Sequence, residues 1–520
     1  MKIKNIMKLL LVAVVISTTG CQKYLDLDPL SNANGEQIWG TAEGNRQLLA
    51  GTYSLFRRIM LSERPFYFYG DLPAQTVLKS NHWISQQVVD GNYAGSYIYD
   101  SYGWSDWSPY YQVITTANTL LNHIEDVPDS EFNKDEATGN KEKKQIAAEA
   151  HFLYAYTYFW LVQVYGDVPL VKEAIESVDQ ALVEGSTVGK AQSSEKDVLE
   201  YCIKHLDAAI ATLDYDTPGS DTWAVRADKG AAQALKAHVC LWLANSYKGT
   251  DKYRELVQTA DDCLAAVIAN GNRSLVDYSN PDAVTEMFNG RSSEGIFELN
   301  VSITQNETYW MYYNWSVHSR TWWSENYTNS NLIASGGNPQ SNLTVADVNW
   351  SQSLYSEKDI RRDLFFENFG SNNTSESRPP MLKKYSTGQQ VDPANAGAYF
   401  ANSNVMLLRL TGIYLLRAEA LYKLGQTGSA RALLNEIRRR SGIGDYMGGD
   451  LLAGIFEERA RELVGEGHSA FDRIRNDYWT GCDWYTADRG AKKGYYWPVY
   501  TGLFSANREL VQGAYWQGKV

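Results

Sequence analysis

Aromatic side chains gather in two polar stretches of the chain, and their chemistry favours ligand binding by ring stacking. Aromatic residues make up 13% of the sequence, but thirteen of them lie in residues 66–111 and eight lie in residues 309–327. Both stretches are also rich in Asn, Ser, Asp or Gly. A sugar presents apolar C–H faces and a rim of hydroxyl groups, so flat rings beside amide, carboxylate and guanidinium groups suit it. These residue types therefore predict a carbohydrate site.

Eight residues in these stretches are the main candidates for contact with a glycan. Trp104 stands just outside a helical stripe, and Arg320 offers bidentate hydrogen bonds beside two indole rings. The alternative is that loop aromatics only anchor the loops on helices, which we expect for Trp107, Tyr110 and Tyr111 because they share a helical register. The candidates are Asn81, Trp83, Trp104, Trp310, Trp315, Arg320, Trp322 and Trp323.

The N-terminus carries a thiol in a setting that predicts covalent modification. Lys2 and Lys4 precede the short apolar run 9–16, and small residues then lead into Cys21. This is the pattern of a secretory signal whose apolar run is too short to cross a bilayer. The small residue before Cys21 also resembles a bacterial lipobox, so we expect residues 1–20 to be removed and Cys21 to be acylated. The alternative is an ordinary secreted protein with Cys21 near its cleavage site.

Residue patterns typical of catalytic and metal centres are missing from the sequence. The seven His residues form no HExxH pair, no Ser stands in a G-x-S-x-G elbow, and no Gly-rich phosphate loop follows a strand. Glu457 and Glu458 lie on a charged helix, where ion pairing with Arg459 or Arg461 is the favoured interpretation. We therefore expect no enzymatic activity, no cofactor and no metal site. A glycosidase remains an alternative, because two carboxylates about 5 to 9.5 Å apart suffice for it.

The remaining cysteines, the charge and the length narrow the class of protein further. Cys202, Cys240, Cys263 and Cys482 are scattered singly, so we expect free thiols, buried in the first three because these fall in helical patterns. A net charge of -13 and a pI near 5.2 disfavour nucleic-acid binding, which needs clustered Lys and Arg. The rest of the 520 residues contains no second apolar run long enough to cross a membrane.

Hydrophobic periodicity predicts the helices that must carry the aromatic loops. The stretch 144–165 is almost wholly apolar after a charged start, so we expect a buried helix there. The polar residues 126–144 before it predict an exposed loop, and their acidic residues lack the spacing of a calcium loop. The expected helices are residues 37–60, 107–124, 144–165, 198–213, 229–247, 253–269, 407–424, 429–440 and 452–466.

Two of these helix pairs resemble tetratricopeptide-type hairpins. Small alanines in residues 418–425 and 430–434 allow two helices to approach closely, and Gly425 permits the turn between them. Residues 231–247 and 253–269 repeat the scheme less perfectly. Such units bury their apolar faces only by stacking, so we expect several to lie side by side. Antiparallel helices without a true repeat are the alternative.

Strand signals are few, which sets the expected fold class. Gly295–Leu299 alternates and predicts a short strand, whereas most of residues 300–390 is Asn-, Ser- and Gly-rich and predicts irregular structure. We therefore predict a mainly α protein, with a tetratricopeptide-like helix-hairpin scaffold, long irregular aromatic-rich loops and little β structure. The expected organisation is a signal peptide at 1–20 and a single domain at 21–520 with loop insertions at about 62–106 and 270–405.

Several motifs in a fixed order resemble the SusD/RagB family of outer-membrane nutrient-binding lipoproteins. The strongest runs from Ala148-Glu149-Ala150-His151-Phe152-Leu153 into Tyr165-Gly166-Asp167-Val168-Pro169-Leu170. The sequence departs from the family at His151, where Arg is usual, and at Ser469-Ala470, where an Arg and an aromatic residue are common. The other motifs are Cys21-Gln22-Lys23-Tyr24-Leu25-Asp26-Leu27-Asp28-Pro29, Tyr110-Tyr111-Gln112, Lys229-Gly230-Ala231-Ala232, Leu407-Leu408-Arg409-Leu410, Glu457-Glu458-Arg459-Ala460-Arg461-Glu462-Leu463 and Tyr496-Trp497-Pro498-Val499.

The resemblance implies a function that the residues alone do not identify. It implies an outward-facing outer-membrane protein, lipid-anchored at Cys21, that binds an oligosaccharide or polysaccharide on its loops without chemistry. It also implies docking on a SusC-like, TonB-dependent transporter, to which the glycan is passed. A helical-repeat scaffold that binds only protein is the first alternative, although such a scaffold has no need of dense loop aromatics, and a glycoside hydrolase is the second.

Overall fold

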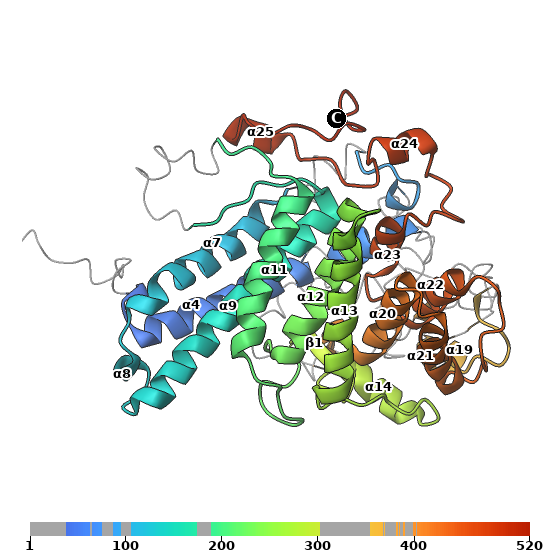
Figure 1. Ribbon diagram of the computed structural model, residues 1–520, viewed down its shortest axis with the longest axis horizontal. Coiled ribbons are helices and arrows are strands. Elements are labelled where there is room, and N and C mark those ends of the chain that lie inside the picture. The colour runs from blue at the N-terminus through green and yellow to red at the C-terminus, as the bar shows by residue number, and fades with distance from the viewer. Residues whose placement is uncertain are drawn as a thin grey trace, which may run out of the picture.

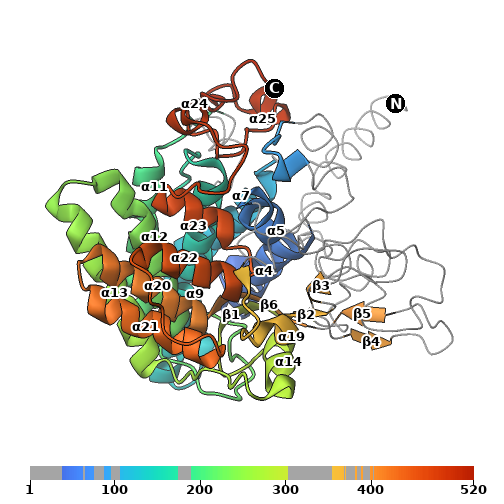
Figure 2. The same cartoon turned by 90° about the vertical axis from the view of Figure 1, so that its right-hand side faces the viewer.

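Helices dominate the described residues, and the strands are few and short (Figures 1 and 2). In the part of the chain that the structure describes, no helix is both long enough and apolar enough to cross a bilayer. The computed structural model describes residues 38–62, 65–74, 87–94, 106–173, 189–301, 354–367, 369, 381–382, 384, 388–390, 399–401 and 403–520.

The elements follow one another along the chain in two helical blocks. The first block contains α4 (Ala42–Ser62), α5 (Pro65–Gly70), η1 (Leu72–Ala74), α7 (Ser108–His123), η3 (Ile124–Asp126), α8 (Asp129–Phe132), α9 (Glu136–Tyr165), α11 (Glu195–Thr212), α12 (Lys229–Leu243), η4 (Ala244–Tyr247), α13 (Asp251–Asn270) and α14 (Pro281–Asn289). The second contains α19 (Arg361–Phe365), α20 (Leu410–Lys423), α21 (Thr427–Arg440), α22 (Leu451–Glu462), α23 (Ser469–Asn476), α24 (Ala487–Ala491) and α25 (Gly502–Ala506). The strands are β1 (Gly295–Leu299), β2 (Phe366–Glu367), β3 (Met381–Leu382), β4 (Gly388–Gln390), β5 (Tyr399–Ala401) and β6 (Val405–Arg409).

Local side-chain chemistry fixes several helix ends. The side chain of Ser194 accepts a hydrogen bond from the backbone N–H of Asp197 at the start of α11, and Asp228 accepts one from Ala231 at the start of α12. Helix α9 ends at Gly166, whose φ of 74° is a left-handed value that glycine adopts most easily. The hydrogen-bonding needs of these helix ends are therefore met within the local sequence.

Successive helices pack side by side, as stacked hairpins do. Helix α9 packs on α11, α11 on α12, α12 on α13, α13 on α20 and α20 on α21. Ala418 and Ala430 are fully buried where α20 and α21 approach, and the turn between them passes through Gly425 with a φ of 82°. The predicted mainly α, tetratricopeptide-like scaffold is confirmed, and so is the turn at Gly425.

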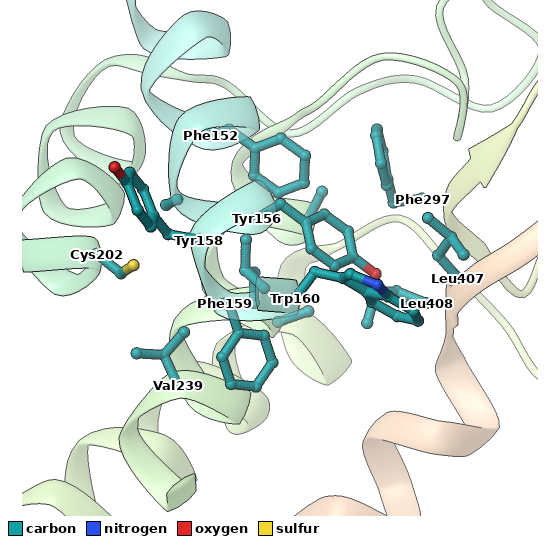
Figure 3. Close-up of a cluster of buried hydrophobic side chains, with 14 of the residues drawn as sticks. Phe152, Tyr156, Tyr158, Phe159, Trp160, Cys202, Val239, Phe297, Leu407 and Leu408 are labelled. Carbon is teal, nitrogen blue, oxygen red and sulfur yellow. The ribbon is translucent and has the colours of Figure 1, made fainter. Parts of the chain in front are cut away.

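Helix α9 lies at the centre of the main hydrophobic core, as its apolar sequence predicts. On one side its rings Phe152 and Tyr156 lie 4.8 and 5.7 Å, centroid to centroid, from Phe297 of β1. On the other side the helix faces Cys202 of α11 and Val239 of α12 (Figure 3). Burial on both sides explains why α9 has almost no polar face over its last five turns.

The strand predicted at Gly295–Leu299 is confirmed as β1, and its partner is β6. The two strands pair antiparallel, from Gly295 opposite Arg409 to Leu299 opposite Val405. Both are buried along their whole length, which explains their near-continuous apolar sequences. The pair joins the two ends of the long segment between β1 and β6. Within that segment, β2 pairs with β3 and β4 pairs with β5.

Two sequence-based predictions about element boundaries are wrong. Residues 126–144, predicted to be a loop, contain α8 and the first turns of α9, because Lys143 donates to the carbonyl oxygens of Glu125 and Val127 at 3.0 Å and ties the polar helix to the preceding turn. The helix predicted at 407–424 begins at Leu410, because the preceding residues pair with β1 as a strand. In both cases tertiary contacts override the local pattern.

Candidate functional site

The predicted glycan-contact residues are not among those that the structure describes. Cys21, Asn81, Trp83, Trp104, Trp310, Trp315, Arg320, Trp322 and Trp323 all lie outside the described residues. Trp107 and Tyr110 are described and are each 4% exposed, and Tyr111 packs partly buried against the same core. These three rings are core anchors, as their helical register predicts.

A cavity of about 600 Å³ opens beside α4, and we call it the α4 cavity. One wall is a single face of α4, from which Arg46, Leu49, Ala50, Tyr53, Ser54, Phe56 and Arg57 project at helical spacing. The first turns of α9, the Val225–Arg226 turn and the end of β1 supply the other walls. Figure 2 shows β1 and β6 beside α4 at this side of the molecule. The lining ends at Asn300, nine residues before the aromatic stretch that begins at Tyr309.

The fully buried carboxylate of Glu149 lies behind the wall of the α4 cavity and binds two of its lining residues, Tyr53 and Arg226. Its Oε2 accepts a hydrogen bond from the Tyr53 hydroxyl at 2.7 Å, and both of its oxygens accept from Arg226, at 2.9 and 2.6 Å. Burial raises the pKa of Tyr53 well above its ordinary value, and the charge of Glu149 adds to this. Burial alone would lower the pKa of Arg226, but Glu149 raises it above the ordinary value. Tyr53 therefore stays neutral and Arg226 stays charged at neutral pH.

A second ion pair stands at the rim of the same cavity. Arg46 of α4 donates to both carboxylate oxygens of Glu142 on α9, at 2.6 and 3.1 Å, and also to the carbonyl oxygen of Phe132 at 2.9 Å. Both side chains keep about a third of their surface exposed, 37% for Arg46 and 35% for Glu142. They can therefore offer further hydrogen bonds to a ligand while holding α4 and α9 together.

Between the two ion pairs the wall is apolar and aromatic. Phe56 and Phe297 lie 6.3 Å apart, centroid to centroid, with their planes tilted by 48°. Glu298 follows on β1; it is 1% exposed, and its Oε2 accepts from Asn404 at 2.9 Å. Burial raises the pKa of Glu298 to about 7. The α4 cavity thus combines ring edges with paired guanidinium and carboxylate groups, which suits an uncharged ligand that carries many hydroxyls.

Half-buried rings also lie together near α23 and α24, and we call them the Trp479 cluster. It consists of Trp479, Trp484, Tyr485 and Tyr495. The rings of Trp479 and Tyr485 stack with centroids 4.2 Å apart and planes 7° from parallel. Trp484 stands across Trp479 at 68°, and its Nε1 donates to the carbonyl oxygen of Pro73 at 2.7 Å. This cluster joins the C-terminal part of the chain to η1.

The charged residues on α22 have structural partners, and they hold the long segment between β1 and β6 in place. Glu462 accepts hydrogen bonds from Arg361 at 2.8 Å, from Arg440 at 3.0 Å and from Arg409 at 3.1 Å. Burial alone would raise the pKa of Glu462, but these guanidinium groups hold it well below its ordinary value. Arg361 begins α19 in the middle of that segment and Arg409 ends β6, so the network fastens α19 and the strand that closes the segment to α22.

The predicted ion pairing of the adjacent carboxylates with Arg459 or Arg461 is confirmed, and the partner is Arg461. Glu458 accepts a hydrogen bond from Arg461 at 2.9 Å, and Glu457 lies 3.8 Å from the same residue. Arg459 instead pairs with Asp472 of α23 at 2.6 Å, because it points to the opposite side of α22. These carboxylates stabilise helix packing.

The thiols of the described residues are in the state that the sequence predicts. Cys202, Cys240, Cys263 and Cys482 are free and buried, as predicted for the first three. Burial raises the pKa of the Cys202 thiol above its ordinary value, so these thiols are inert. Within the described ranges, His, Cys, Asp and Glu side chains form no group of three or more that could hold a metal ion.

Sequence reasoning did not single out the α4 cavity or the Trp479 cluster. A usable signal was present for each. Arg46, Tyr53 and Arg57 recur at helical spacing on one predicted helix, and Glu149 stands inside the strongest family-like motif. Residues 478–516 are as visibly rich in aromatics as the two stretches chosen from the sequence. The residues that complete each of these two sites come from distant parts of the chain, so only the fold brings them together.

Two sequence models of one family match the chain and together cover most of it. The model described as "SusD family" matches residues 299–516, and the model described as "Starch-binding associating with outer membrane" matches residues 24–241. The first includes the α22 network and the Trp479 cluster, and the second includes α4, α9 and the Glu149 contacts.

Known proteins resemble the chain along nearly its whole length. A SusD-like protein of Formosa agariphila is 23% identical over 92% of this chain and 92% of its own length. A solved SusD homologue of Bacteroides thetaiotaomicron has a TM-score of 0.75 at 23% identity and covers 92% of this chain and 99% of its own. A solved laminarin-binding SusD-like protein has a TM-score of 0.64 at 21% identity and covers 91% and 99%. These likenesses show a shared fold.

Proposed function

Because this chain belongs to the SusD/RagB family, we propose that it captures an oligosaccharide at the cell surface and passes it to a TonB-dependent transporter. The matching model described as starch-binding and outer-membrane-associated supports this, and so does the laminarin-binding protein of the same fold. One of these names starch and the other laminarin, so we propose a carbohydrate ligand without choosing its sugar.

The observation that carries the proposal is the chemistry of the α4 cavity. The half-buried ring of Tyr53 and the apolar wall beside it can meet the apolar face of a sugar, while Arg46 and Glu142 at the rim can meet its hydroxyls. Its volume of about 600 Å³ is of the size that small-molecule sites have. We propose that the aromatic loops extend this site through Asn81, Trp83, Trp104, Trp310, Trp315, Arg320, Trp322 and Trp323.

We propose that the site binds without catalysing a reaction. Glycoside hydrolysis needs a general acid and a second free carboxylate across the scissile bond. At the α4 cavity, both oxygens of Glu142 accept from Arg46, and both oxygens of Glu149 accept from Arg226. Glu298 has a raised pKa but is 1% exposed. These carboxylates are engaged in holding the protein together, which supports the binding function over the hydrolase alternative.

Binding should be weak, because the site must release its ligand to the transporter. A stacked ring contributes about 1 kcal/mol beyond the area it buries. A shallow site that uses two or three rings therefore binds with a micromolar to millimolar Kd, which corresponds to roughly 4 to 8 kcal/mol. A scaffold that binds only protein would show no such affinity for any glycan.

The test is a glycan array, followed by titration calorimetry, on the protein that lacks residues 1–21. Wild type should bind at least one glycan class, and Ser54→Trp should weaken that binding at least tenfold, because it fills the α4 cavity from an exposed position. The control Gln47→Trp places the same ring at an exposed position of α4 that does not line the cavity, and it should bind as wild type. Equal affinity in all three proteins would remove the α4 cavity from the site.

The aromatic loops are tested separately. Trp83→Ala, Trp104→Ala and Trp322→Ala should each weaken glycan binding and leave the Tm unchanged. If these changes unfold the protein instead, the rings are core anchors and the loop part of the proposal fails. Release of reducing sugar by the wild type, lost after a carboxylate change, would move the protein to the hydrolase class.

A further inference from the structure

The Trp479 cluster presents aromatic rings whose orientation is fixed by a single exposed carboxylate. Oδ1 of Asp477 accepts a hydrogen bond from Nε1 of Trp479 at 2.8 Å and one from the Tyr485 hydroxyl at 3.5 Å. Tyr495 stacks on Trp479 at 5.5 Å with an interplanar angle of 26°. One carboxylate therefore holds two parallel rings in register at the surface.

The backbone at Asp477 adopts a conformation that costs free energy. Its φ is 50° and its ψ is 41°, in the left-handed region, directly after α23. Glycine adopts this conformation without a Cβ penalty, and Asp tolerates it better than most residues. An Asp at this position costs some stability but provides the acceptor for both rings. Strain retained beside a fixed group of half-buried rings is typical of functional positions.

Rigid supports lie beneath the rings. Arg473 donates to the carbonyl oxygen of Thr480 at 2.8 Å, which closes the turn that carries Trp479. The guanidinium of Arg489 lies 4.2 Å from the Trp484 ring centroid and donates to the carbonyl oxygen of Gly91 at 2.8 Å. A ligand that stacks on these rings would not need to order them first, so little affinity is lost to entropy.

The chemistry around the rings favours a sugar over an apolar protein surface. Asp477, Thr480, Asp483 and Thr486 are exposed around the cluster and offer carboxylate and hydroxyl groups at its rim. The large exposed hydrophobic residues of the described chain are Met447, Val511 and Val520, and none belongs to the cluster. Flat rings within a polar rim match the apolar face and hydroxyl edge of a pyranose.

The position of the cluster links it to the predicted glycan loops. Trp484 is anchored on Pro73 and Arg489 on Gly91, and α24 lies at the same end of the molecule as the segment around residue 90 (Figure 1). Pro73 lies eight residues before Asn81 in the sequence. The cluster therefore stands beside the roots of the chain segments that carry predicted glycan-contact residues.

We infer that the stacked pair Trp479 and Tyr485 is an additional carbohydrate subsite, which binds one pyranose unit of a longer glycan by stacking. The subsite rests on the proposed glycan-binding function and extends it along the sugar chain. A long oligosaccharide reaches both the main site and the Trp479 cluster, whereas a short one fills only the main site. The subsite thus selects for chain length.

The test compares affinities for a ladder of oligosaccharides. Maltose to maltoheptaose, laminaribiose to laminariheptaose and the glycans selected on the array are titrated into the protein lacking residues 1–21. Trp479→Ala should weaken binding of the longest chains about five- to tenfold, the loss of one stacked ring, and leave the shortest binding chains within twofold.

Two further variants keep the test decisive if Trp479→Ala does not fold. Asp477→Gly relaxes the backbone strain and removes the carboxylate that orients the rings, so it should weaken binding of long chains while the Tm holds or rises. Tyr215→Ala, which removes a half-buried ring in the loop between α11 and α12, should leave every affinity unchanged.

The outcomes separate the subsite from the proposed function. If wild type binds no glycan on the array, the proposed function fails and the subsite fails with it. If wild type binds and folded Trp479→Ala and Asp477→Gly bind long chains equally well, the subsite alone is overturned. Unchanged glycan affinity together with loss of a co-purifying membrane protein would also overturn it and make the cluster a protein contact.

Discussion

Glu149 shows how one residue can position a whole site. It is completely buried on α9, yet it receives the Tyr53 hydroxyl from α4 and the guanidinium of Arg226 from the turn before α12. Three segments far apart in the sequence therefore meet on one carboxylate. The cost of burying this charge is offset only while both partners remain in place. These two contacts give a structural reason for the Glu in the strongest of the family-like motifs.

Replacing Glu149 by Gln should destabilise the protein and deform the α4 cavity. The amide keeps the size of the side chain but leaves Arg226 without a counter-charge, and Arg226 remains 41% exposed and can be hydrated. We therefore expect a loss of about 2 kcal/mol in the free energy of unfolding, below the 3–5 kcal/mol of a fully buried pair. Urea denaturation measures it. Glu142→Gln, which breaks the exposed pair at the rim, should cost less than about 1 kcal/mol. Equal losses would contradict the central position of Glu149.

His151, the departure from the family motif, makes a contact with another histidine. Its Nδ1 lies 2.8 Å from Nδ1 of His205, which itself stacks on Tyr154 at 4.2 Å. Such a contact needs one ring to donate and the other to accept, so the accepting ring must be neutral. Burial lowers the pKa of His151 to about 4, and burial together with His151 lowers that of His205 to about 3. The ion pair expected of an Arg is replaced by a neutral hydrogen bond.

This pair should make the protein sensitive to acid. The unfolded histidines protonate near pH 6.5, whereas the folded ones stay neutral down to about pH 4 and 3. Stability is therefore complete above about pH 6.5 and falls as the pH drops toward 4, by about 2.5 kcal/mol per histidine at pH 4.5. His205→Phe keeps the stacked ring and removes one titrating group, so its urea midpoint should fall less between pH 7 and 4.5. Identical slopes in both proteins would contradict the assignment.

At the scale of elements, α22 acts as the anchor of the long segment between β1 and β6. The segment leaves the helical body at β1 and returns at β6, and these strands pair with each other. Glu462 and Glu466 of the α22 region bind Arg409 at the end of β6, at 3.1 and 2.7 Å. A segment that carries predicted ligand contacts thus begins and ends on a rigid base.

Removing the charge of Glu462 should loosen the attachment of that segment to α22. Glu462→Gln would leave Arg361, Arg409 and Arg440 with one counter-charge too few in a buried site, and breaking such a network costs about 3–5 kcal/mol. The loss is measured as the free energy of unfolding in urea. Glu457→Gln on the same helix is the control, because its side chain is 52% exposed and its pair with Arg461 is 3.8 Å long. If Glu457→Gln lowers the free energy of unfolding as much as Glu462→Gln does, the net charge of the helix matters and the buried network does not.

The sequence predicts the helices well because their stabilisation is largely local in pattern. The apolar stripe of α7, the capped start of α12 and the Gly425 turn can each be found from neighbouring residues. The loop predicted at residues 126–144 was wrong because a polar helix that is held in place by Lys143 has no apolar stripe by which to recognise it. The predicted start of α20 was wrong because the residues just before this helix pair with β1, which lies over a hundred residues away in the sequence.

The candidate sites were less predictable than the helices for a physical reason. The α4 cavity is formed by α4, α9, the Val225–Arg226 turn and β1, and the Trp479 cluster rests on Pro73. No short stretch of sequence contains either site. Aromatic density in the sequence marks where rings are abundant, but buried rings such as Tyr93, which stacks on Trp497 at 4.5 Å, share that density. The fold is needed to separate rings that pack from rings that are presented.

At the scale of the whole molecule, the stacked helices leave a broad helical surface that suits protein contact. We propose that this surface docks on the mouth of a TonB-dependent transporter and covers it as a lid. Native membranes solubilised in mild detergent should then yield the protein together with an outer-membrane barrel protein of large mass, identified by mass spectrometry. Recovery of the protein always alone, under conditions that preserve other membrane complexes, would contradict the lid.

Such a lid also requires an anchor, which we propose is the acylated Cys21. Each buried methylene of an acyl chain contributes about 0.8 kcal/mol, so several chains hold a protein of this size stably at a bilayer. Wild type should appear in the membrane fraction, incorporate an alkyne-labelled fatty acid and be cleaved by protease added to intact cells. Cys21→Ala should be unlabelled and released from membranes. Cys263→Ala is the matched control, because it removes a buried thiol and leaves the N-terminus intact. If Cys21→Ala remains membrane-bound, the protein has another anchor, and the handover of glycan must be explained without a tethered lid.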